Sequence, residues 1–110
     1  MSEDPGRVFA ALADPTRRWI LQALLREGST SVPELTAGLS ISRQAVAKHV
    51  SALDEAGLLE REPAPGREVR YRLREGALAP ASSWLQDAEA AWDARLGRLK
   101  RSVEQSRPKD

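Results

Sequence analysis

The side chains best suited to molecular recognition in this sequence lie within residues 43–55. At about 100° per residue of a helix, Gln44, Lys48 and Ser51 fall on one side of this segment. The other side carries the apolar residues Val46, Val50 and Leu53. A Gln amide can bond adenine through two atoms, and Lys or Arg can bond guanine. The spacing therefore predicts a helix that buries one face in a core and offers a polar, basic face to a major groove.

The start of this helix adds two features that favour an anionic partner. Ser42 is expected to cap the helix, and Arg43 lies in the first turn, where a long side chain reaches past the helix end. The free backbone N–H groups and the positive dipole end of a helix start favour a nearby phosphate. The simpler alternative is an ordinary surface helix, whose outer face is polar because it meets water.

His49, the only histidine, lies at the flank of the predicted buried side. One interpretation is a partly buried, hydrogen-bonded ring, and the other is a contact between the ring and a DNA phosphate. The sequence leaves both open. A single histidine offers no cluster that could act as a cooperative pH switch.

A charged hairpin is predicted after this helix. Residues 58–62 and 68–73 form the expected strands, and residues 63–66 form the turn between them. In the second strand, apolar residues alternate with arginines, which would therefore stand on the solvent side in any case. Neighbouring glutamates can pair with several of these arginines. Arg67 at the turn is the best candidate for a DNA contact, and Arg70 is the next.

Two short helices joined by a tight turn and followed by a charged hairpin are the plan of a winged helix-turn-helix. The predicted fold class is therefore mainly α with a small β-hairpin (α+β), with about five helices and a two-stranded wing. The expected helices cover residues 7–13, 15–27, 33–39, 43–55 and about 80–104. We expect one domain over residues 7–104, with flexible termini at 1–6 and 105–110. The predicted DNA-binding residues are Ser42, Arg43, Gln44, Ala47, Lys48, His49, Ser51, Arg67 and Arg70.

Composition restricts the remaining function classes. The chain has 110 residues, 41% hydrophobic and 30% charged, which is typical of one globular domain. Its net charge of +1 means that any basic surface must come from the arrangement of charges. With no cysteine and one histidine, the sequence offers no thiol nucleophile and no nucleophile–base arrangement, so we expect no enzyme activity and no cofactor. No signal peptide pattern and no apolar run of about 18 residues is present, which predicts a soluble, cytoplasmic protein with no membrane partner.

The last predicted helix carries an apolar stripe too wide for a small domain to bury by itself. The predicted dimer interface combines this stripe with the first helix, through Phe9, Leu12, Trp84, Trp92, Leu96 and Leu99. The alternative is a small-molecule pocket lined by tryptophan. The two are compatible, because ligand sites often lie at such interfaces.

Four blocks of the sequence resemble the ArsR-type family of bacterial winged-helix repressors. They are residues 11–18 (ALADPTRR), 41–53 (ISRQAVAKHVSAL), 56–59 (AGLL) and 66–73 (GREVRYRL), in the order and spacing of that family. The resemblance covers about residues 7–104. It implies a homodimer that binds double-stranded DNA at an inverted-repeat operator, with helix 42–55 in the major groove, the hairpin at the adjacent groove or backbone, and residues 80–104 as the dimerisation helix. Family members generally repress transcription and release DNA when an inducer binds.

The chain departs from the metal-sensing members of this family. Ser31 and Pro33 stand where such members carry a pair of cysteines, and the last helix has acidic residues but no histidine. Carboxylates alone bind zinc-like ions poorly, so no metal site is expected. The chain resembles instead the members without metal ligands, regulated by an unidentified small-molecule effector and associated with the nucleoid. The alternative function is a winged-helix module that binds another protein.

Overall fold

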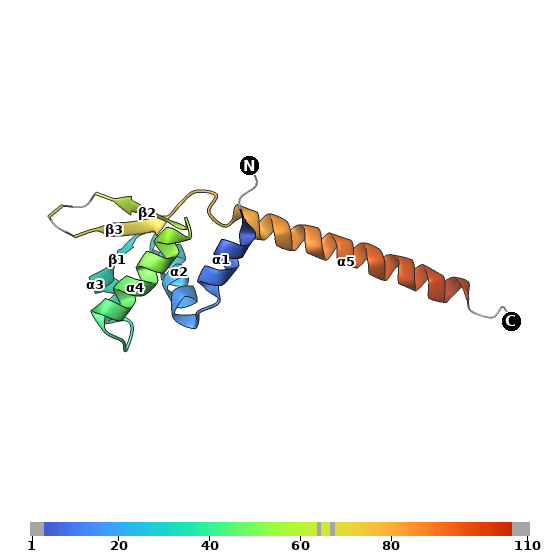
Figure 1. Ribbon diagram of the computed structural model, residues 1–110, viewed down its shortest axis with the longest axis horizontal. Helices are drawn as coiled ribbons and strands as arrows, with labels where there is room; N and C mark the ends of the chain where they lie inside the picture. Colours follow the sequence, from blue (N-terminus) through green and yellow to red (C-terminus); the bar gives the residue numbers. More distant parts are fainter. Residues whose placement is uncertain (1–3, 64, 67, 107–110) are drawn as a thin grey trace.

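The computed structural model describes residues 4–63, 65–66 and 68–106, and most of them are helical. In chain order the elements are α1 (Pro5–Leu12), α2 (Pro15–Glu27), β1 (Thr30–Ser31), α3 (Val32–Ala37), α4 (Arg43–Glu55), β2 (Leu59–Glu62), β3 (Arg70–Leu73) and α5 (Ala79–Gln105). Helices α1 to α4 and the sheet form a head, and α5 runs away from it as a single rod (Figure 1). The predicted α+β class, with five helices and a two-stranded wing, is confirmed.

Helix α1 begins earlier than predicted, because Asp4 and Pro5 together form a helix start. The Asp4 carboxylate accepts a hydrogen bond from the backbone N–H of Gly6 at 2.9 Å. Pro5 occupies the first turn, where its fixed φ suits the helix and its missing N–H costs nothing. The prediction of a flexible leader over residues 1–6 is therefore wrong for Pro5 and Gly6.

The wing belongs to a three-stranded antiparallel sheet in the order β1-β3-β2. Glu62 of β2 lies opposite Arg70 of β3, and Thr30 of β1 lies opposite Tyr71 on the other side of β3. Both wing strands were predicted, although they are shorter than expected. Strand β1 was not, because two residues are too few to show an alternating pattern. This third strand attaches the wing to the start of α3.

The core lies between α2, α3, α4 and the sheet. Its most deeply buried apolar side chains are Ile20, Leu24, Leu35, Val46, Val50, Leu53 and Leu58. Three of them come from α4 at steps of four and three residues, so the helix buries the side that its periodicity predicted. The polar side of α4 is left facing outward.

Helix α5 leaves the head after its first turns. Its 27 residues, at about 1.5 Å rise per residue, make a rod of about 40 Å. Ala81 is buried against the head, and the Phe9 and Trp84 rings meet edge to face with their centroids 5.6 Å apart. The helix extends through Gln105, which corrects the predicted flexible terminus at that residue. None of the helices in the described part of the chain, α5 included, is long and apolar enough to cross a membrane.

Candidate nucleic-acid interface

Helix α4 and the residue that caps it carry seven of the nine predicted DNA-binding residues. Its start is fixed by Ser42, whose Oγ accepts a hydrogen bond from the backbone N–H of Ala45 at 3.1 Å. The exposed members are Ser42, Arg43, Gln44, Lys48 and Ser51, with Ala47 half-buried at the edge. We call these six residues the recognition face. Their arrangement agrees with the helical wheel drawn from the sequence.

Three long side chains of the recognition face have no partner within the described part of the chain. No ion pair or hydrogen bond joins the Arg43, Gln44 or Lys48 side chain to another described residue. Two cations and one amide are therefore available to an external ligand. A small, polar, basic surface at a helix start is the kind that enters a major groove.

His49 lies beside the recognition face, at the junction of α4 with α2. Its ring is half-buried, and Nδ1 lies 3.9 Å from Oδ1 of Asp14, which is too long for a hydrogen bond. The same carboxylate accepts hydrogen bonds from the backbone N–H groups of Thr16 and Arg17. Above all the Arg17 N–H, and to a smaller extent the charge of His49, lower the pKa of Asp14. The partly buried position is thus observed, and the phosphate contact stays a prediction.

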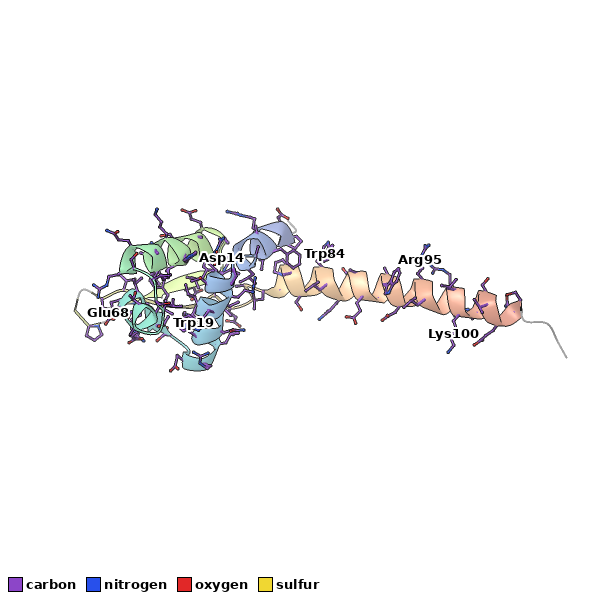
Figure 2. All side chains as sticks on the ribbon, turned by 90° about the horizontal axis from the view of Figure 1, so that it is seen from below. Asp14, Trp19, Glu68, Trp84, Arg95 and Lys100 are labelled. Atoms are coloured by element: carbon purple, nitrogen blue, oxygen red, sulfur yellow. The ribbon has the colours of Figure 1, made fainter. Side chains whose placement is uncertain are left out.

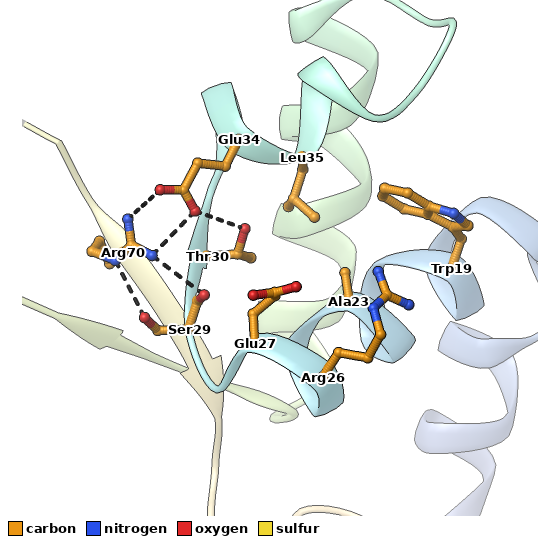
Figure 3. A pocket seen from close by; sticks show the side chains of 9 residues that line it. All are labelled: Trp19, Ala23, Arg26, Glu27, Ser29, Thr30, Glu34, Leu35 and Arg70. Carbon is orange, nitrogen blue, oxygen red and sulfur yellow. Dashed lines mark hydrogen bonds and ion pairs between the residues drawn. The ribbon is translucent and has the colours of Figure 1, made fainter.

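Arg70 lies in the sheet rather than on the recognition face. Its guanidinium donates to both carboxylate oxygens of Glu34, at 2.7 and 3.1 Å, and to the side chain and backbone oxygens of Ser29 (Figure 3). We call Ser29, Glu34 and Arg70 the latch, because together they join β3 to α3. The hydrogen bond from Arg70 lowers the pKa of Glu34 and raises that of Arg70. Arg67, the other predicted wing contact, lies outside the described residues.

Two other arginines of the wing strands are also paired. Arg72 donates two hydrogen bonds to Glu60, at 2.8 and 3.0 Å, and Nε lies 3.6 Å from Glu62. Arg61 reaches Asp54 at the end of α4, at 3.4 Å. The Arg72 contacts follow the simpler interpretation of the alternating charges, in which arginines pair with neighbouring glutamates, and the Arg61 contact joins the wing to α4. Among the described residues of α4, β2 and β3, the cations without an ion-pair partner are therefore Arg43 and Lys48, both on α4.

The latch was missed from the sequence, although one signal was present. Ser31 and Glu34 have the spacing of a capping box, and Ser31 Oγ accepts a hydrogen bond from the Glu34 backbone N–H at 3.3 Å. The Glu34 carboxylate, however, turns away to Arg70 and Thr30. Ser31 is thus used as a helix cap.

Among the residues that the structure describes, no group of three His, Cys, Asp or Glu could hold a metal ion.

An exposed recognition helix after a tight turn, backed by a wing, defines a winged helix-turn-helix DNA-binding domain. A family model described as a helix-turn-helix domain matches residues 12–62. The chain is 43% identical over 92 residues to the HTH-type transcriptional regulator Rv2034 of Mycobacterium tuberculosis, over 84% of this chain and 81% of that protein. It belongs to the ArsR-type family of helix-turn-helix transcriptional regulators.

Solved structures agree with this family. The structure of an ArsR-like transcriptional regulator from Rhodococcus sp. RHA1 matches with a TM-score of 0.75 and 42% identity, over 88% of this chain and 90% of that one. The homodimeric winged helix-turn-helix DNA-binding domain of Mb0332 from Mycobacterium bovis matches with a TM-score of 0.60 and 25% identity, over 76% and 77%. These similarities point to a regulator rather than an enzyme.

Proposed function

We propose that the chain acts as a homodimeric, sequence-specific DNA-binding repressor. In this proposal α4 reads the major groove and the wing tip approaches the neighbouring groove or the backbone. The observation that carries the proposal is the recognition face, with its exposed amide and cations that have no partner in the described part of the chain. Such a protein acts on chromosomal DNA, so we place it in the cytoplasm at the nucleoid.

The dimer is supported by the surface of α5. Six large apolar side chains of this helix are each 43–59% exposed: Trp84, Leu85, Trp92, Leu96, Leu99 and Val103. Contiguous apolar surface of this kind marks an interaction site. A second copy of the chain would cover it, together with the half-buried Phe9 and Leu12 of α1. Two-fold symmetry then presents two recognition helices to two half-sites of an inverted repeat.

Fluorescence anisotropy tests this function, with DNA from upstream of the protein's own gene and scrambled DNA at two salt concentrations. We expect tighter binding to the upstream DNA, and weaker binding at high salt because phosphate contacts release counterions. Gln44→Ala should cost about 1–3 kcal/mol at one base position and little on scrambled DNA. Gln22→Ala, exposed on α2, is the matched control. Equal, weak binding to both DNAs would contradict sequence-specific recognition at this site.

The second candidate is a winged-helix module that binds another protein. It is favoured by the pairing of Arg70 and Arg72 with glutamates, which reduces the positive charge of the wing. A steep fall of DNA affinity with salt counts against it, because only phosphate neutralisation gives that slope.

A further inference from the structure

A cleft of about 490 Å³ opens between the end of α2, β1, α3 and β3 (Figure 3). The described residues that line it include none from α4 or α5, so it is separate from the recognition face and from the apolar stripe. Its volume is in the range of sites that hold small molecules. The latch forms one wall of the cleft, and Trp19, Arg26 and Glu27 reach into it from α2.

Four charged side chains line the cleft, and only two of them pair with each other. Arg70 and Glu34 satisfy each other within the latch. Arg26 and Glu27, in contrast, form no ion pair or hydrogen bond with any residue in the described ranges. One guanidinium and one carboxylate, neighbours in the last turn of α2, are thus left to meet a ligand. Their complement is a molecule that carries an anionic group and an ammonium group close together.

The rest of the lining consists of Thr30 and three apolar residues. The half-buried Trp19 ring, Ala23 and the buried Leu35 line the side opposite the latch. The edge of the Trp19 ring lies close to Gly38, where a Cβ would be only 2.9 Å from its Cη2 atom. An aromatic wall beside two opposite charges suits an apolar side chain attached to a zwitterionic head.

We propose that this cleft binds a small zwitterion of the α-amino-acid type with an apolar side chain, and that binding lowers operator affinity. The carboxylate of the ligand pairs with Arg26 and its ammonium with Glu27. Both groups also compete for the partners within the latch, since a carboxylate attracts Arg70 and an ammonium attracts Glu34. A loosened latch leaves β3 attached to α3 through β1 alone, and so changes the position of the wing relative to α4. The regulatory part of this inference rests on the proposed DNA-binding function.

Isothermal titration calorimetry of the full chain, without DNA, tests the site. The probes are L-phenylalanine and L-leucine, with N-acetyl-L-phenylalanine and L-phenylalaninamide as analogues that each lack one charge. We expect the free amino acids to bind once per chain, with a Kd of about 1 mM or tighter, and each analogue to bind about tenfold more weakly. Arg26→Gln and Glu27→Gln should weaken binding similarly, and Arg95→Gln, exposed on α5, should not. No saturable heat up to about 10 mM would overturn the site. Analogues that bind as tightly as the free amino acids, or cleft variants that bind them as tightly as the wild type, would also overturn it.

Anisotropy with operator DNA, with and without L-phenylalanine, tests the regulation. We expect the amino acid to lower operator affinity severalfold in the wild type and to have no effect on Arg26→Gln. An amino acid that binds in the calorimeter but leaves operator affinity unchanged overturns the regulatory step. Loss of operator binding in the absence of any amino acid is a different result, because it contradicts the proposed function and leaves the calorimetric test intact.

Discussion

Glu34 accepts two hydrogen bonds from the Arg70 guanidinium, and these hold the pKa of its carboxyl below the ordinary value. A carboxyl with a lowered pKa stabilises the folded state through its ionised form. The contribution is complete above the ordinary pKa of glutamate, and it is lost as the pH falls through the lower pKa of the folded protein. The latch therefore stabilises the fold at neutral pH, and acid weakens the contact between the wing and α3.

The contact between Glu34 and Arg70 should contribute to the stability of the fold at neutral pH. We expect Glu34→Gln to lower the melting temperature at neutral pH by a few degrees, because an amide cannot accept two charge-assisted hydrogen bonds from Arg70. The difference from the wild type should disappear in acid, where the wild-type carboxyl is also protonated. Scanning fluorimetry over a pH series measures both, with Glu89→Gln, exposed on α5, as control. A Glu34→Gln protein as stable as the wild type at neutral pH would show that the latch contributes nothing.

At the scale of elements, the turn after α3 is constrained by one aromatic ring. A Cβ at Gly38 would lie 2.9 Å from Cη2 and 3.2 Å from Cζ2 of Trp19. The φ of Gly38 is −96°, a backbone conformation that any residue adopts. The close approach of the Trp19 ring, rather than the backbone conformation, therefore excludes a larger residue at this position. The packing of α3 against α2 depends on this missing side chain.

The same substitution at two glycines should therefore have opposite effects. Gly38→Ala must displace the Trp19 ring, and we expect it to reduce the free energy of unfolding by about 1–3 kcal/mol. Gly97→Ala lies in α5, where the nearest atom is 3.5 Å away on the Arg101 side chain, and it should add about 0.5–1 kcal/mol. Urea unfolding of both variants checks this pair. A neutral Gly38→Ala would mean that the ring moves aside freely.

The elements also show which features a sequence can predict. The orientation of α4 was predictable because Val46, Val50 and Leu53 repeat within one helix. The latch was not, because it joins Glu34 to Arg70 across 36 residues and no local pattern reports such a pairing. Strand β1 is too short to have a period. The early start of α1 was open to prediction, since Asp4-Pro5 repeats the Asp14-Pro15 pair that begins α2.

At the scale of the whole molecule, the exposed stripe of α5 predicts how assembly can be separated from folding. Trp92 is 57% exposed and lies in α5 three residues before Arg95, which Figure 2 shows on the rod beyond the head. Trp92→Glu should therefore leave the head folded and abolish the dimer, because it places a charge in the apolar contact. Ala94→Glu adds the same charge on the opposite side of the helix and should leave the dimer intact.

Light scattering after gel filtration measures the mass of both variants, and anisotropy measures their DNA affinity. We expect Trp92→Glu to lose most affinity for a two-half-site operator and to keep weak binding to a single half-site. A dimeric Trp92→Glu protein would place the interface elsewhere.

The protruding α5 has a consequence for gene dosage. Where most chains are single, the amount of paired protein varies with the square of the total amount, since two chains must meet to form each pair. Halving the protein in a dividing cell then leaves about a quarter of the pairs able to hold both half-sites at once. A promoter under such control responds steeply to dilution and to the rate of synthesis, before any effector is present.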